Sequence, residues 1–185
     1  MKILGIIGGI APGSTIEYYR LLMEGWRQKM PGRGYPPIII NSIDLDRMLA
    51  MVGAQAFGAL AQYLLDEIQR LASAGAQLAL LASNTPHVVF DTLRERSPLP
   101  LISIVEAIYP EVFSGHGMTL LRPSDAEQAF IHEKYMSELV NGVFSSQTRD
   151  RILTVADRMR KERGGIPLLD TTKIHVDDAL ARLLE

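Results

Sequence analysis

The chain has 185 residues, of which 47% are hydrophobic and 22% charged, enough for one sizeable core or two small lobes that share an interface. Its formal net charge is −2, its pI is near 6.1, and its Lys and Arg residues are scattered, which argues against nucleic acid or an anionic membrane surface as a partner. The absence of cysteine excludes disulfides, thiolate zinc sites and a cysteine nucleophile.

The chain begins with the apolar run MKILGIIGGIAPG, in which KILGIIG (2–8) is typical of a buried first strand. Glycine and proline interrupt this run well before the roughly 20 residues that a bilayer span requires. We therefore expect neither a membrane segment nor an export signal, and a cytoplasmic location.

The next segment, residues 14–30, has apolar side chains at helical spacing. Ser14 and Glu17 fit a capping box, which predicts that this helix begins at Ser14 or Thr15. The sequence PPIIINSIDL (36–45) predicts a second strand, and residues 58–76 predict a long helix that is closed by Gly75.

QLALLAS (77–83) is typical of a third strand, and Pro86 suits the first position of a helix after a Thr85 cap. PLISIV (100–105) predicts a fourth strand, followed by another helix. Apolar strands that alternate with amphipathic helices predict an α/β lobe with a parallel sheet over residues 1–114.

Residues 115–171 predict a second, shortened α/β lobe. GMTLLRP (117–123) and GIPLLDT (165–171) have the pattern of short strands, and they flank two consecutive helices between Ser124 and about Arg163. Because such lobes alternate strand and helix, the pattern suggests missing segments near 118–119 and 164–165. The last helix, 172–185, is expected to pack back on the first lobe.

The first loop, GGIAPGST (8–15), has glycine spacing like that of a phosphate-binding loop, but Ser14 stands where the lysine is needed. This disfavours a nucleoside triphosphate. A glycine-rich turn at a helix N-terminus instead suits a small anion such as a carboxylate. The alternative is a plain strand-to-helix turn that Ser14 caps.

The same pattern recurs at SNTPH, where Ser83, Asn84 and Thr85 follow a buried strand and precede a helix. Both loops should therefore open at the carboxyl edge of one sheet, where α/β proteins place their ligands. Two helix N-termini at that edge would form a carboxylate clamp. The alternative is that Thr85 is only an N-cap and Asn84 a turn residue.

Four separated motifs, in this order, resemble the aspartate/glutamate racemase family: GIIGGIAPGSTIEYYR, INSIDLDR, LLASNTPH and IPLLDTTKIH. The resemblance implies two Rossmann-like lobes with parallel sheets around a central crevice, commonly as a homodimer. It also implies inversion of Cα in acidic amino acids without a cofactor, by two cysteines that act from opposite faces.

Carried over by position, the resemblance implies that Asn84 and Thr85 bind the α-carboxylate and ammonium, with Thr15 and the Gly9 backbone beside them. Arg47 lies where an arginine would hold the side-chain carboxylate of aspartate in a bidentate pair. The alternative for Arg47 is a surface charge.

Ser83 occupies the position of the first family cysteine, and an unactivated hydroxyl is a poor base. Its alternative role is that of a small polar residue kept for space and hydrogen bonding. The motif of the second cysteine is absent, but His175 matches a histidine near that base, so the resemblance makes Ser83 and His175 the candidate catalytic residues. His87 is expected on the helix after its cap, and no histidine spacing predicts a metal site.

The sequence therefore predicts a racemase-type isomerase for an acidic amino acid such as aspartate or glutamate, independent of pyridoxal phosphate and homodimeric. Two alternatives stay open. One is a non-catalytic protein that binds dicarboxylates or amino acids with the same clamp. The other is a related carbanion enzyme, either a decarboxylase or a dicarboxylate isomerase.

Overall fold

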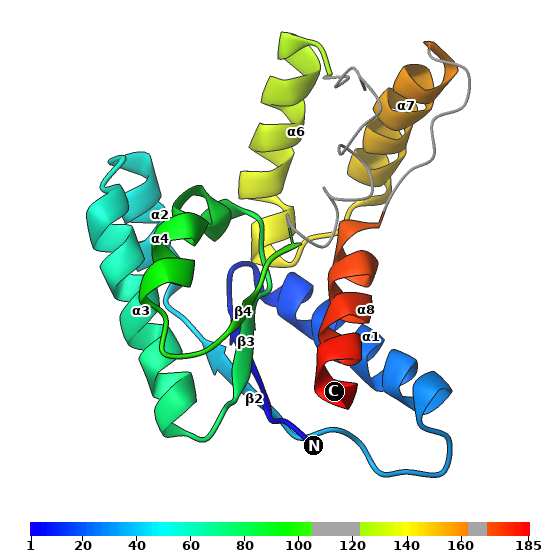
Figure 1. Cartoon of the computed structure of the whole chain (residues 1–185). Helices are drawn as coiled ribbons and strands as arrows, with labels where there is room; N and C mark the ends of the chain where they lie inside the picture. The colour runs from blue at the N-terminus through cyan, green and yellow to red at the C-terminus, as the bar shows by residue number, and fades with distance from the viewer. Residues whose placement is uncertain (105–122, 163–169) are drawn as a thin grey trace. The chain divides into compact units, whose positions relative to one another are not determined.

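The computed structural model describes residues 1–104, 123–162 and 170–185, which divide into two units (Figure 1). The first unit contains residues 1–104 and 170–185, and the second contains residues 123–162. The strands expected at 117–123 and 165–171, and the suggested gaps near 118–119 and 164–165, lie almost wholly outside these ranges. Within the ranges, no helix combines the length and apolarity needed to cross a membrane.

The first unit is built on a parallel sheet with the strand order β2-β1-β3-β4. Its strands are β1 (Leu4–Gly8), β2 (Ile38–Ser42), β3 (Leu78–Leu81) and β4 (Leu101–Ile102), which confirms the four strands expected from the sequence. The register places Leu4 opposite Ile38 on one side and Leu78 on the other. Strands β1 and β3 are buried along their whole length, because helices cover both faces.

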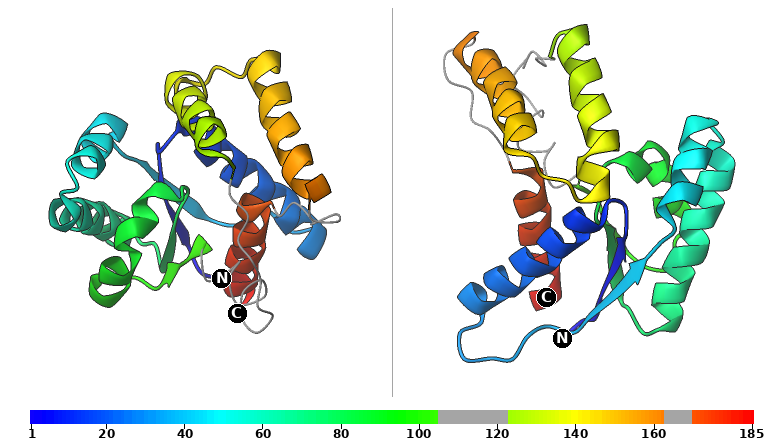
Figure 2. Two further views of the ribbon diagram at one scale, coloured as in Figure 1. Left: turned by 90° about the horizontal axis from the view of Figure 1, so that it is seen from above. Right: turned by 180° about the vertical axis from the view of Figure 1, so that it is seen from behind.

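One face of this sheet is covered by α1 (Pro12–Lys29) and α8 (Thr171–Leu184), which lie side by side in Figures 1 and 2. Side chains at helical spacing on both helices share one buried cluster with the strands: Tyr18, Leu22 and Trp26 from α1, and Val176, Ala179, Leu180 and Leu183 from α8. A Cβ on Gly25 would overlap the Leu180 side chain, so this glycine lets the two helices approach closely.

The opposite face is covered by α2 (Leu45–Gly53), α3 (Phe57–Ser73), the 3₁₀ helix η1 (Thr85–Val89) and α4 (Phe90–Arg96). Because side chains alternate along a strand, Ile7, Ala79 and Leu81 face this layer. Helix α3 closes at Gly75, whose φ is +99°, as the sequence predicts.

Two helix starts differ from the sequence prediction. Helix α1 begins at Pro12 with Ala11 as its N-cap, and the expected capping box does not form. Proline is pre-organised for the first helical turn, which moves the start two residues upstream of Ser14. The expected Thr85 cap is also wrong, because η1 already begins at Thr85 and Asn84 takes the cap position without a side-chain bond. Helix α2 was not predicted.

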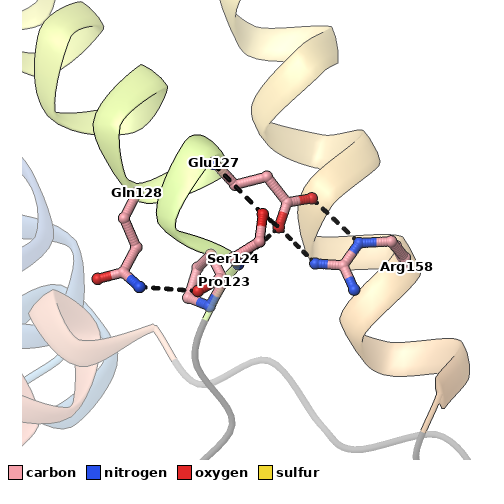
Figure 3. A network of polar contacts seen from close by, with 5 residues as sticks. All are labelled: Pro123, Ser124, Glu127, Gln128 and Arg158. Carbon is pink, nitrogen blue, oxygen red and sulfur yellow. Dashed lines mark hydrogen bonds and ion pairs between the residues drawn. The ribbon is translucent and has the colours of Figure 1, made fainter.

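The second unit contains the two consecutive helices that the sequence predicts, α6 (Asp125–Ser137) and α7 (Ser146–Glu162), joined by the short η2 (Leu139–Asn141). A capping box of Ser124 and Glu127 begins α6, and Gln128 donates to the carbonyl of Pro123 (Figure 3). Arg158 of α7 donates to both oxygens of Glu127 at 2.6 and 3.0 Å, which ties the helices together. The hydrogen bonds from Arg158 have the largest effect on Glu127 and those from Ser124 the next largest, and together they lower the pKa of Glu127 to about 2.

Candidate functional site

The candidate site lies at the carboxyl ends of β1 and β3, which are neighbours in the sheet. From β1 the chain continues to β2 on one side and later returns to β3 on the other side. Helix α1 packs on one face of the sheet and α3 on the opposite face. This arrangement is the topological switch point at which doubly wound sheets bind ligands. The two loops therefore open at one edge, as the sequence predicts.

The loop after β1 is shaped by Gly8, Gly9 and Thr15. Gly9 has a φ of +83°, and its N–H donates to Thr15 Oγ1 at 2.9 Å. A Cβ on Gly8 would lie 2.6 Å from Thr15 Cγ2, so only glycine lets the first turn of α1 sit this close to the strand. Because the Thr15 oxygen accepts from Gly9, its own hydrogen remains to donate to a further acceptor, such as a carboxylate.

Ser14 joins the two loops. Its hydroxyl donates a 2.8 Å hydrogen bond to the carbonyl oxygen of Ala82, which directly follows β3. The N–H of Ala82 donates to the carbonyl of Ile7 at 2.9 Å, so the sheet pairing continues to the edge. The start of α1 and the end of β3 are thereby held as one piece, a role for Ser14 that the capping-box prediction missed.

The loop after β3 carries Ser83, Asn84 and Thr85. Ser83 and Thr85 are half-buried and Asn84 is exposed. The Ser83 hydroxyl oxygen accepts a long hydrogen bond of 3.4 Å from the backbone N–H of Thr85. Within the described ranges no histidine, lysine or carboxylate is bonded to that hydroxyl, so nothing there activates Ser83 as a base.

His87 braces this loop through its backbone. Its Nδ1 lies 2.9 Å from the carbonyl oxygen of Ser83, and its Nε2 lies 3.4 Å from the N–H of Ile104. A carbonyl only accepts and an N–H only donates, so the ring is a neutral tautomer with its hydrogen on Nδ1. Burial lowers the pKa of His87, and the ring stacks on Phe90 at a centroid distance of 4.8 Å.

His87 lies within η1, as the sequence predicts, but its contact with the Ser83 carbonyl was not predicted. The available signal was its spacing. His87 follows Ser83 by four residues, one helical turn, so its side chain can return to the Ser83 carbonyl.

Arg47 lies in the first turn of α2, the helix that follows β2. Its backbone N–H donates to the Asp44 carboxylate at 3.0 Å, and its exposed guanidinium stands 4.5 Å from the ring centroid of Tyr63. Tyr63 is in turn held by the N–H of Asp44, which donates to its hydroxyl at 3.1 Å. Stacking leaves the in-plane N–H groups of a guanidinium able to bind a carboxylate.

His175 occupies a different environment from the other candidates. It is fully buried, with Nδ1 2.7 Å from the Tyr18 hydroxyl and Nε2 3.0 Å from the carbonyl oxygen of Ile102. The carbonyl requires a hydrogen on Nε2, so Nδ1 accepts from Tyr18. Burial lowers the pKa of His175 to about 4. In this arrangement the ring links α1, α8 and β4 and has no exposed surface through which to contact a substrate.

The structure thus joins Gly9 directly to Thr15, and it ties their loop through Ser14 to the loop of Ser83, Asn84 and Thr85. Arg47 follows the adjacent strand β2, whereas His175 is enclosed beneath the helices. In the part of the chain that the structure covers, no three His, Asp or Glu side chains gather in a way that could hold a metal ion.

Comparison with known proteins identifies a family and several similar solved structures. The Asp/Glu/Hydantoin racemase family model matches residues 7–121. A candidate Asp/Glu racemase from Yersinia pestis is similar over 100% of both chains, with a TM-score of 0.81 and 25% identity. An aspartate racemase homologue from Pyrococcus horikoshii has the same fold, with a TM-score of 0.79, 23% identity and 100% coverage of both chains.

Proposed function

The chain belongs to the Asp/Glu/Hydantoin racemase family, and on that premise we propose that it is a racemase-type isomerase that binds an acidic amino acid without a cofactor. The Ser14–Ala82 hydrogen bond carries the proposal, because it unites the loops after β1 and β3 at the switch point of the sheet. Two strand-to-helix loops that are held together at this point can bind one small dicarboxylate between them.

Each binding residue takes a role that suits its chemistry. The Thr15 hydroxyl, held by Gly9, donates to the α-carboxylate together with groups of Asn84 and Thr85. The amide oxygen of Asn84 accepts from the ammonium. The planar guanidinium of Arg47, kept in place on Tyr63, receives the side-chain carboxylate as a bidentate pair.

The reaction requires a base that removes the Cα proton, followed by delivery of a proton to the opposite face of the carbanion. Ser83 stands at the base position of the loop after β3, and His87 fixes its backbone. Without a cofactor, donors at the carboxylate must carry the negative charge that develops in the carbanion. We assign His175 a positioning role, since it holds α8 against β4 through Ile102 and against α1 through Tyr18.

A second function, binding without catalysis, is favoured by the state of Ser83. The chain has no cysteine, and the Ser83 hydroxyl has no basic partner in the described structure. A serine in this state is protonated at neutral pH and removes a Cα proton poorly. The clamp would then serve a protein that binds acidic amino acids or dicarboxylates.

We further propose, from the family resemblance, that the protein acts as a cytoplasmic homodimer. Light scattering coupled to gel filtration tests the assembly directly. A mass of one chain, 20.5 kDa, at micromolar concentration would contradict the homodimer.

Hydrogen exchange at Cα separates the two functions. The protein is incubated with L- or D-aspartate or glutamate in deuterated water, and the Cα proton is followed by NMR alongside chiral analysis. Exchange with racemisation that Ser83→Ala abolishes supports the isomerase. Saturable binding without exchange, weakened by Arg47→Gln, supports the binding protein. Absence of both binding and exchange for these substrates contradicts the proposed function.

A further inference from the structure

A second candidate binding site lies at the amino-terminal edge of the same sheet, away from the loops that follow β1 and β3. A cavity of about 350 Å³ opens there, between the start of the chain, the end of α1 and the end of α8. The lining residues that carry the argument are Lys2, Trp26, Met30, Arg33, Leu183 and Leu184. Because Lys2 precedes β1 in a parallel sheet, these residues stand at the opposite edge from Ser83.

One side of this cavity is apolar and well fixed. Trp26 is only 1% exposed, and its indole N–H donates to the carbonyl of Gly34 at 2.7 Å, which holds the ring in one orientation. Leu183 is buried beside it in the core between α1 and α8. Met30 and Leu184 extend this surface towards solvent. An aliphatic or aromatic body placed here removes apolar area from water.

Two cationic side chains at the cavity, Lys2 and Arg33, differ in whether they already have a partner. Lys2 is already engaged, because it donates to the carbonyl of Arg182 at 3.3 Å and lies 4.0 Å from the Glu185 carboxylate. The side chain of Arg33 has no hydrogen bond, ion pair or ring contact with any residue that the structure describes. The backbone N–H of Arg33 donates to the carbonyl oxygen of Met30, and this hydrogen bond holds the turn beside the cavity. The lining therefore combines an apolar side with the exposed Arg33 guanidinium, while the carboxylate of Glu185, which also lines the cavity, lies near Lys2.

We propose that this cavity is a second ligand site, which takes a small amphipathic carboxylate. The carboxylate pairs with the guanidinium of Arg33, and the apolar body lies along Met30, Leu184 and the edge of Trp26. The volume is at the lower end of the range for small-molecule sites, about 300–1,000 Å³, which limits the ligand to a short chain or a single ring. The proposal does not depend on the function of the carboxyl edge.

The chain offers a direct reporter, because Trp26 is its single tryptophan. Octanoate is titrated into the protein below its micelle concentration while the emission of Trp26 is followed. We expect a saturable change in emission. Arg33→Gln should weaken the affinity for octanoate about fivefold, which corresponds to the upper range of the energy of an exposed ion pair. Lys29→Gln is the matched control, because it removes the same charge from the end of α1 without touching the cavity.

A second variant tests the apolar wall. Leu184 is 43% exposed, so Leu184→Glu should preserve the fold while it places a charge against the apolar chain of octanoate and weakens binding. The proposal is overturned by any of three results: no saturable change, equal affinity of Arg33→Gln and Lys29→Gln, or octylammonium binding as tightly as octanoate. Competition by excess aspartate would also overturn it, because that result would place octanoate at the carboxyl edge.

Discussion

Ser14 and Ala82 are 68 residues apart in the chain, and a 2.8 Å hydrogen bond from the serine hydroxyl to the alanine carbonyl joins them. Ala82 is fully buried, so this carbonyl has no access to water as a substitute partner. The bond connects the first turn of α1 to the end of β3. The geometry of the candidate site therefore depends on one short side chain.

Replacing Ser14 with alanine should lower the free energy of unfolding by about 1–2 kcal/mol, because it leaves a buried acceptor without a donor. Urea denaturation measures the change. Ser73→Ala, at the exposed end of α3, is the control and should stay within about 0.5 kcal/mol of the wild type. Equal effects of the two substitutions would show that the Ser14 bond does not stabilise the loops.

Gly9→Ala should be among the most damaging single changes in the first unit. The φ of +83° strains an alanine, and its Cβ would lie 2.7 Å from Ser42 Oγ and 2.8 Å from the Ile43 carbonyl oxygen. Gly32 has a similar φ of +79° but nothing within 4 Å, so Gly32→Ala measures the strain alone. We expect a loss of about 1 kcal/mol for Gly32→Ala and about 3 kcal/mol or more for Gly9→Ala. Similar midpoints of urea denaturation for both variants would refute the crowding at Gly9.

The His87 ring should be neutral at pH 7 with its hydrogen on Nδ1. Burial lowers the pKa of the ring, and the Ser83 carbonyl oxygen accepts a hydrogen bond from the Nδ1–H group. Long-range ¹⁵N–¹H NMR of the imidazole distinguishes the tautomers. His87→Asn retains a donor near Nδ1 and should bind aspartate more tightly than His87→Ala. A ring protonated on Nε2 would contradict the bracing role.

Stability should fall as pH decreases from about 7 to 4, partly because of His175. Its pKa is about 4 in the folded protein and 6.5 as a free side chain, so between these values the unfolded state binds the additional proton. The contribution of the neutral His175 ring to the free energy of unfolding is fully present above pH 6.5. It is lost as the pH falls to 4, and the total loss is about 3 kcal/mol at most. His175→Gln should show a flatter dependence of unfolding free energy on pH from 7 to 5, with His87 titrating in both proteins. Parallel slopes would contradict the buried, neutral state.

Ser83→Cys should raise the rate of Cα hydrogen exchange of aspartate in deuterated water at least about tenfold. A thiol reaches its thiolate form near neutral pH far more readily than serine reaches its alkoxide. Ser97→Cys, in the turn before β4, supplies the matched thiol outside the site. No gain over Ser97→Cys would argue that Ser83 does not stand at the position of a base.

The parallel sheet and all its helices except α2 could be predicted because each of these elements has a local signal. The run over β1 is continuously apolar, and α3 has helical periodicity with Gly75 at its end. The start of α1 was misplaced because two local signals compete there. The capping-box spacing of Ser14 and Glu17 favours one start, and Pro12 favours the other, which the structure adopts.

The pattern of apolar and polar residues predicts two polar loops, after β1 and β3, at one edge of a parallel sheet, because strand and helix periodicity are local properties. What each polar side chain does at that edge depends on long-range packing. Ser14 bonds to Ala82, 68 residues away, and His175 to Tyr18, 157 residues away. Such pairings depend on how the helices pack across the sheet, and residue spacing along the chain does not encode that packing.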